Sequence, residues 1–116
     1  MIIKKISDVP RQDVKMEGAK DVKARIVLGP DDNAPTFAMR VFELAPGGHT
    51  PFHAHPFEHE AVILEGKIGA VSESATRELE VEDVLLIYPD EKHQFRNLSD
   101  SEPARFMCLV PVEYQA

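Results

Sequence analysis

The sequence predicts an all-β fold of the antiparallel barrel or jelly-roll type, and three observations support this prediction. Short segments rich in β-branched and aromatic residues recur along the 116 residues, separated by turn-forming residues. Nine prolines and six glycines punctuate the chain, and no stretch carries the sustained apolar repeat of an amphipathic helix. Many short strands in one small domain favour closure or double layering of the sheet, because closure protects exposed strand edges.

Eight strands are expected, in order along the chain. Each one combines strand-forming residues with flanking turn residues, and the expected ranges are 25–28, 37–44, 60–64, 67–73, 77–81, 84–88, 93–97 and 104–110. Residues 1–24 carry weaker strand signals, so we expect an N-terminal edge strand or arm there and a barrel core over residues 25–112. At this length we expect residues 1–116 to form a single domain.

The strand expected at residues 37–44 is apolar on both faces. Alternation places Arg40 on the same face as Phe42, with Val41 on the opposite face. A strand covered on both sides needs a second layer or a subunit interface, so we expect a homodimer. If Arg40 faces the interior, its guanidinium needs acceptors. It is then either part of a structural salt bridge or positioned to meet an anionic or carbonyl group of a ligand.

The last strand, 104–110, places Phe106 and Cys108 on one face. If this face is the interior, both side chains line a pocket together with Arg40 and Phe42. A buried cysteine is most often a small apolar filler, and the alternative is a direct chemical role for Cys108.

Charge and cysteine content narrow the function classes. The chain has 13 Lys and Arg against 20 Asp and Glu, a formal net charge of −7, so no positive field is available to attract nucleic acid or an anionic membrane surface. Cys108 is the single cysteine, which excludes an intrachain disulfide. The amino terminus turns polar before any signal-peptide core develops. We therefore expect a cytoplasmic protein with a small-molecule partner.

Three histidines within seven residues, with a fourth further along the chain, predict a metal site. In an extended strand, His53 and His55 project to the same face and can direct both imidazoles at one point. His59 and His93 are the candidates for the remaining ligands. Neutral imidazole is the commonest protein ligand for first-row transition metals. His49 has no clear place in this group, and we expect a loop residue or a group that contacts the ligands.

The spacing around these histidines resembles the first motif of the cupin family, G-x5-H-x-H-x3,4-E-x6-G. Gly47, His53 and His55 match without adjustment, and Gly66 follows at the correct distance when His59 occupies the glutamate position. Glu60 is the alternative to His59, but it leaves only five residues before the last glycine. Neighbouring residues of a strand face opposite sides, so only one of the two can point inward, and we favour His59.

The second cupin motif, G-x5-P-x-G-x2-H-x3-N, is altered but recognisable. His93 and Asn97 match it. Glu82 replaces the first glycine and Asp90 the second, so the turns are changed while the histidine is kept. Aspartate tolerates unusual backbone angles, and we expect Asp90 to serve the turn.

The overall pattern resembles the small single-domain cupins, the cupin 2 conserved barrel type, that hold manganese with four histidines. The resemblance implies a double-stranded β-helix or jelly-roll barrel with an ion held by His53, His55, His59 and His93. Manganese is the first expectation, with iron, nickel, zinc and copper as alternatives. Four nitrogen ligands leave two positions open on an octahedral ion, which suits a metal-dependent oxidoreductase of the dioxygenase type acting on a small organic molecule. The alternatives are a non-catalytic module that binds a small ligand or metal, and a metal-dependent sugar isomerase.

Overall fold

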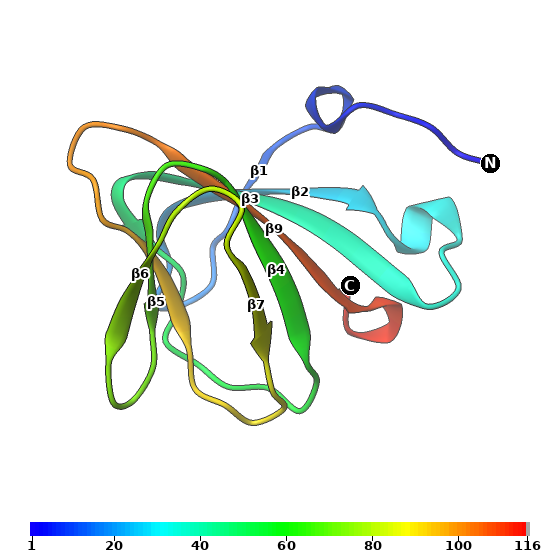
Figure 1. The fold of residues 1–116 in the computed structure, drawn as a ribbon. Helices are drawn as coiled ribbons and strands as arrows, with labels where there is room; N and C mark the ends of the chain where they lie inside the picture. Colours follow the sequence, from blue (N-terminus) through cyan, green and yellow to red (C-terminus); the bar gives the residue numbers. More distant parts are fainter. Residues whose placement is uncertain (116) are drawn as a thin grey trace.

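The structure, a computed structural model that describes residues 1–115, contains one curled antiparallel sheet (Figure 1). Within the described residues, its strands are β1 Gln12–Asp13, β2 Lys20–Leu28, β3 Phe37–His49, β4 His59–Glu65, β5 Ile68–Val71, β6 Thr76–Leu79, β7 Val84–Ile87, β8 Gln94–Asn97 and β9 Ala104–Pro111. Three short 3₁₀ helices are η1 Ile6–Asp8, η2 Pro30–Asp32 and η3 Val112–Tyr114. The predicted all-β barrel fold is confirmed.

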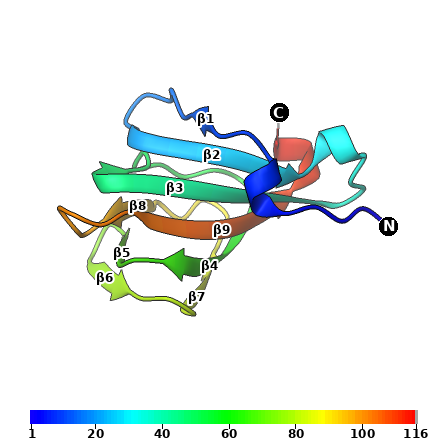
Figure 2. The ribbon, with the colours of Figure 1, turned by 90° about the horizontal axis from the view of Figure 1, so that it is seen from above.

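Strands far apart in the sequence lie next to one another in this sheet. The order is β6-β5-β8-β3-β9-β4-β7, with β2 on the free side of β3 and β1 beside β2. Figure 2 shows β2, β3 and β9 side by side, with β4 beyond β9. The antiparallel pairing joins strands that are distant in the sequence, as in a jelly roll.

Each of the eight expected strands overlaps an observed strand. Two strands are longer than the sequence indicated. β2 begins at Lys20 and β3 continues to His49, and these two residues are paired. A register shift lies between Lys20 and Val22, and Asp21 between them has a positive φ of 51°. Such a bulge lets pairing continue past an irregular residue, so hydrogen bonds to a partner strand override weak local strand preference.

The outer face of β2 and β3 is covered in part by the chain's own N-terminal segment. Arg25 lies opposite Val41, which is fully buried, and its Nε donates to the carbonyl of Val9 at 2.8 Å. Glu43 on the same face pairs with Arg25 at 2.7 Å and with Arg11 at 3.1 Å. Part of the cover expected from a second subunit therefore comes from residues 9–11, and the homodimer stays a prediction.

The core occupies the inside of the curled sheet. Inward-facing residues alternate with less buried ones along β9, and Phe106 and Cys108 are each 1% exposed. Leu44 of β3, Ile63 of β4 and Ile68 of β5 meet them in one apolar cluster. This packing closes one end of the sheet and leaves the other end open as a pocket. None of the helices among residues 1–115 has the length and apolar character needed to cross a membrane.

Candidate metal centre

The four histidines come from three parts of the chain. His53 and His55 lie between β3 and β4, outside the named strands, whereas His59 begins β4 and His93 directly precedes β8. The expectation that one regular strand carries the first two was therefore wrong. The extended conformation is held instead by a bridge in which His53 and His93 exchange backbone hydrogen bonds of 3.1 and 2.9 Å. This pairing joins the two segments that carry the cupin motifs.

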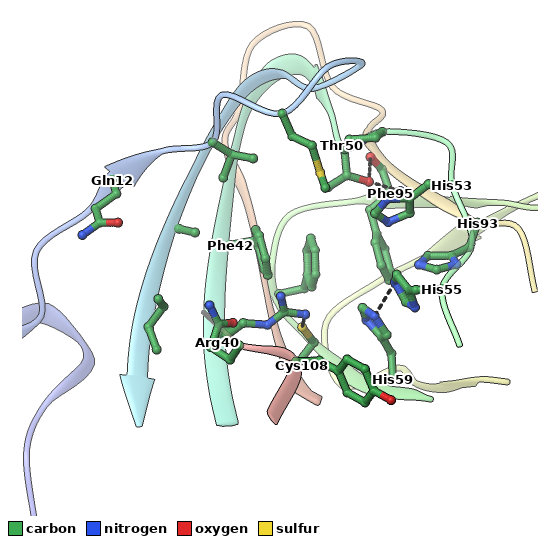
Figure 3. Close-up of a pocket in the computed structure, with 18 of the residues that line it drawn as sticks. Gln12, Arg40, Phe42, Thr50, His53, His55, His59, His93, Phe95 and Cys108 are labelled. Atoms are coloured by element: carbon green, nitrogen blue, oxygen red, sulfur yellow. Dashed lines mark hydrogen bonds between the residues drawn. The ribbon is translucent and has the colours of Figure 1, made fainter. Parts of the chain in front are cut away.

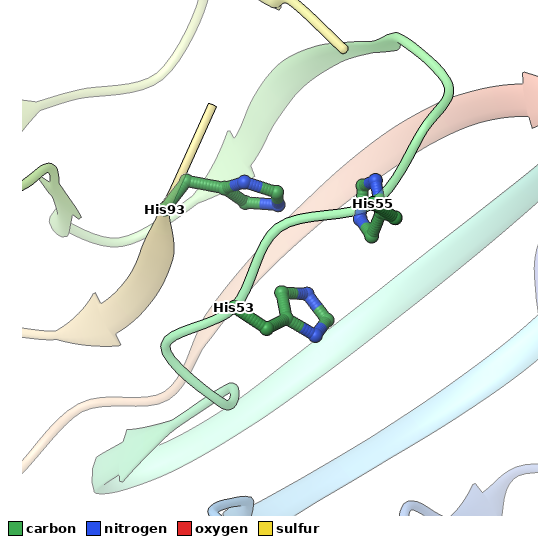
Figure 4. A group of neighbouring side chains, drawn as sticks. All are labelled: His53, His55 and His93. Carbon is green, nitrogen blue, oxygen red and sulfur yellow. The ribbon is translucent and has the colours of Figure 1, made fainter. Parts of the chain in front are cut away.

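The imidazoles converge on one region (Figure 4). One ring nitrogen each from His53, His55 and His93 lie within 4.8 Å of one another. His59 joins this group through His55, because their Nε2 atoms are 2.7 Å apart. His59 and His93 are buried at 6% and 7% exposure, while the other two are half-buried. The cluster is thus closed on the protein side and accessible from the pocket.

Backbone carbonyls fix the tautomers of two of these rings. Nδ1 of His93 donates to the carbonyl of Glu91 at 2.8 Å, and Nδ1 of His55 donates to the carbonyl of Phe57 at 3.3 Å. A carbonyl can only accept, so both Nδ1 atoms carry the proton when the ring is neutral. The Nε2 atoms of these rings then carry lone pairs, which is the usual arrangement of metal-binding histidines.

The environment lowers the pKa values of three imidazoles of the cluster and keeps them neutral. Burial is the main cause that lowers the pKa of His53 from 6.5 to about 4, and the pKa of His59 from 6.5 to about 2. Burial also lowers the pKa of His55, and the neighbouring imidazoles and Arg40 add to these effects. Removing positive groups from water beside other positive groups disfavours their protonation. At neutral pH the rings of His53, His55 and His59 therefore offer lone pairs and not charges.

The donor set fits a bound cation. The two Nε2 atoms of His55 and His59 face each other at 2.7 Å, although the Nε2 of His55 carries no proton when its Nδ1 donates. Nδ1 of His59 is buried and has no hydrogen-bond partner among the described residues. Without a cation this contact is a hydrogen bond in which the Nε2 of His59 donates, and a bound cation would displace that proton and take both nitrogens as ligands. Borderline-soft nitrogen donors of this kind suit first-row transition ions.

His59 and Glu60 occupy opposite faces of β4. His59 is buried and faces the cluster, whereas Glu60 is exposed on the outer face beside Leu86. Alternation along the strand produces this difference, as expected from the sequence. A carboxylate ligand from this strand is therefore absent from the cluster, and imidazole occupies the position.

Two turns with unusual backbone angles carry the altered second motif. Glu82 has a φ of +80° in the turn closed by the Asp83 amide and the Glu80 carbonyl. Asp90 has a φ of +66° in the turn before His93, after Pro89. Both residues stand at the third turn position, where a positive φ favours glycine. The expectation that Asp90 serves the turn is confirmed, and the motif keeps its backbone path without its glycines.

A cavity of about 370 Å³ leads to the histidines (Figure 3). Aromatic rings form much of its wall: Phe42 stacks on Phe106 at 5.1 Å, Phe95 stacks on Phe106 at 4.2 Å, and Phe57 stacks on Tyr114 at 4.2 Å. Sequence reasoning proposed Phe42 and Phe106 but missed Tyr114. Tyr114 lies beyond the expected barrel core, so only its position after β9 could have indicated it.

Arg40 and Cys108 lie side by side in the same cavity. Arg40 Nη2 donates to Cys108 Sγ at 2.9 Å, and the guanidinium carbon lies 5.0 Å from the centre of the Phe42 ring. Burial raises the pKa of Cys108 and Arg40 opposes this rise, so Cys108 is a thiol at neutral pH. His49 does not line the cavity; it ends β3 and contacts the Thr50 carbonyl at 3.2 Å. It is therefore a strand residue and not a loop residue.

The sequence profile of the cupin domain family matches residues 40–110, which include the histidine cluster. The chain belongs to the cupin family. The structure of the polyketide cyclase RemF from Streptomyces resistomycificus superposes on this cupin with a TM-score of 0.92 and 31% identity, covering 100% of this chain and 82% of that chain.

Two further relatives are longer proteins. The 1-methylthio-D-xylulose 5-phosphate methylsulfurylase of Rhodospirillum rubrum is 35% identical over 81 residues, which are 70% of this chain and 51% of that protein. The polyketide synthase CurC of Streptomyces cyaneus is 31% identical over 70 residues, 60% of this chain and 46% of that protein. The present cupin therefore spans about half the length of the curated relatives it matches.

Proposed function

We propose that this cupin is a metal-dependent enzyme in which four histidines hold one divalent transition ion next to a small organic substrate. The proposed ligands are His53, His55, His59 and His93, and manganese is the first candidate metal. One observation carries the proposal: neutral imidazole donors converge at the end of a cavity of about 370 Å³ whose walls are largely aromatic. Convergent donors beside an apolar pocket are typical of an active site.

Each part of the pocket has a separate task in this proposal. His55 and His93 present Nε2 lone pairs because backbone carbonyls hold the Nδ1 atoms of their rings. A bound divalent ion would act as a Lewis acid on a substrate oxygen. Phe42, Phe95 and Phe106 form a stacked wall that excludes water and orients a flat substrate against the cluster.

We propose carbonyl chemistry without net oxidation as the reaction class. Four neutral ligands leave the ion with its full positive charge, which favours polarisation of a carbonyl and raises the cost of higher oxidation states. Two relatives point in the same direction, since one is a polyketide cyclase and the other a polyketide synthase. An intramolecular condensation of a poly-β-carbonyl compound is therefore the leading candidate.

An oxidoreductase of the dioxygenase type is the second candidate. The same donor set leaves open positions on an octahedral ion, and these positions suit oxygen or a bidentate substrate. The sugar isomerase has less support, because the cavity wall contributes more apolar than polar groups. A binding module without catalysis is the outcome to expect if no reaction is found.

The test loads the protein with Mn, Fe, Ni, Zn or Cu and supplies a linear triketone. Mass spectrometry measures the cyclised, dehydrated product, and an oxygen electrode measures oxygen consumption. We expect a cyclised product without oxygen uptake, its loss in His93→Ala, and its retention in Glu60→Ala, which removes a carboxylate outside the cluster. Oxygen uptake would favour the dioxygenase, and the absence of turnover with every metal would contradict enzymatic function.

A further inference from the structure

Arg40 places a cation in the pocket, and its guanidinium has few hydrogen-bond acceptors around it. It comes from the inward face of β3, is half-buried, and lies over the Phe42 ring at 5.0 Å (Figure 3). Its Nη2 donates to Cys108 Sγ at 2.9 Å. Its Nε is buried and has no hydrogen-bond partner among residues 1–115. One strong donor of the guanidinium is thus left without a partner beside the cavity.

No carboxylate of the described chain pairs with Arg40. The other partly buried arginine of the same sheet, Arg25, is paired with Glu43 at 2.7 Å and also donates to a backbone carbonyl. Cys108 is a thiol, which is a weak acceptor and carries no charge to balance the guanidinium. An unpaired charge in a partly buried site costs free energy, and proteins normally compensate it with an anion. Arg40 therefore lacks the partners of a structural arginine.

We propose that Arg40 binds a planar anionic oxygen group of the substrate, either a carboxylate or an ionised phenol or enol. The substrate class is then a flat organic anion that lies between Arg40 and the histidine cluster. This inference rests on the proposed function, because it concerns the same pocket. Arginine suits this task, since its planar fork matches the geometry of two oxygens and stacks on aromatic rings.

The lining of the cavity supports this substrate class. Arg40 and the histidines line one cavity of about 370 Å³. Contacts between neighbouring rings run from Arg40 through Phe42, Phe106 and Phe95 to His93. A flat apolar body fits against such rings, while its charged end meets the guanidinium. Recognition of both ends would fix the orientation of the substrate before any reaction.

The experiment measures binding of two probes, benzoate and the uncharged benzamide, by titration calorimetry. The full chain is used both as purified, with its metal content measured, and after removal of metal with a chelator. We expect the wild type to bind benzoate at least about tenfold more tightly than benzamide in both series, as a charged hydrogen bond to a partly buried guanidinium implies. In Arg40→Met the preference is lost while benzamide binding is unchanged, and Arg40→Lys retains part of it.

Thermal unfolding of the metal-free protein separates a binding role from a structural one. Because Arg40 is unpaired, we expect Arg40→Met to unfold at the same or a higher temperature than the wild type. The matched control Arg25→Met removes a paired arginine and is expected to lower the unfolding temperature while keeping the preference for benzoate.

Four results would overturn the inference. The first three are equal affinity for both probes in the wild type, a preference that survives in Arg40→Met, and an Arg40→Met variant that fails to fold or unfolds at a lower temperature. A preference seen only with metal bound also contradicts it, because the carboxylate would then be binding the ion. The measurements on the metal-free protein do not depend on the proposed metal site. The inference on Arg40 and the proposed function can therefore fail separately.

Discussion

His53 and His59 differ from exposed histidines because burial, together with neighbouring positive groups, lowers their pKa values to about 4 and about 2. In the unfolded chain both return to about 6.5. At pH values between the folded and the unfolded pKa values, the unfolded state binds more protons than the folded state. The free energy of unfolding therefore rises with pH over this pH range. The metal-free protein should therefore be fully stabilised above about pH 6.5 and lose stability progressively as the pH falls toward 4.

Urea unfolding of the metal-free protein at a series of pH values tests this dependence. The variants His53→Gln and His59→Gln should flatten the decline between pH 6.5 and 4, because the proton uptake of the unfolded state is reduced. His49→Gln is a control at a histidine that does not line the cavity. A free energy of unfolding of the wild type that stays constant or increases as the pH falls from 6.5 to 4 would contradict the neutral cluster.

Glu82 carries a backbone conformation that suits glycine. Its φ is +80°, and its side chain is exposed. A non-glycine residue in this region costs about 1–2 kcal/mol. We therefore predict that Glu82→Gly increases the free energy of unfolding by about 1 kcal/mol, as measured by chemical denaturation.

The matched control is Glu80→Gly, two residues earlier, where the backbone has no positive φ. Glycine there should destabilise the protein by about 0.5–1 kcal/mol, since it only adds freedom to the unfolded chain. If both variants are destabilised equally, the strain at Glu82 is refuted.

The sequence predicted the roles of some single residues but not of others. The histidine spacing was sufficient to direct attention to four imidazoles, and alternation along β4 was sufficient to separate His59 from Glu60. The sequence left the role of Arg40 open, because the absence of a carboxylate near its guanidinium depends on how distant strands meet. Local patterns do not contain that information.

The N-terminal segment is attached to the sheet by a charged network around Glu43. This carboxylate is 20% exposed and binds both Arg25 and Arg11, while Arg25 also holds the Val9 carbonyl. Partly buried networks contribute more than isolated surface pairs. Residues 9–11 therefore depend on one carboxylate of β3.

Glu43→Gln should weaken this attachment. We predict a loss of about 1–2 kcal/mol of unfolding free energy and faster amide hydrogen exchange in residues 5–14. The control Glu78→Gln removes an exposed pair with Lys67 at 3.6 Å and should change stability by less than about 0.5 kcal/mol. Equal exchange in wild type and Glu43→Gln would show that the segment is held by other contacts.

The strands themselves were largely predictable, and their ends were not. Apolar alternation and turn residues located all eight expected strands. The extensions of β2 to Lys20 and of β3 to His49 arise from mutual pairing across a bulge at Asp21. The two-residue β1 lies within the N-terminal segment for which an edge strand or arm was expected, and its exact position depends on pairing with β2.

At the scale of the whole molecule, closure of one sheet explains both the core and the site. Motif residues separated by about forty positions meet because His53 pairs with His93, and the pocket is completed by segments from both ends of the chain, among them Val14 and Tyr114. The family resemblance was sufficient for the fold, but the pocket walls required the three-dimensional path. The homodimer stays a prediction that rests on the two apolar faces of β3, one of which is covered in part by residues 9–11.

The most direct test of the central claim is the metal content of the purified protein and of single-histidine variants, measured by elemental analysis. We predict about one transition ion per chain in the wild type and in Glu60→Ala, and its loss in His53→Ala, His59→Ala and His93→Ala, with circular dichroism as the control for folding. Equal metal content in the wild type and the folded histidine variants, or loss in Glu60→Ala alone, would contradict the four-histidine site.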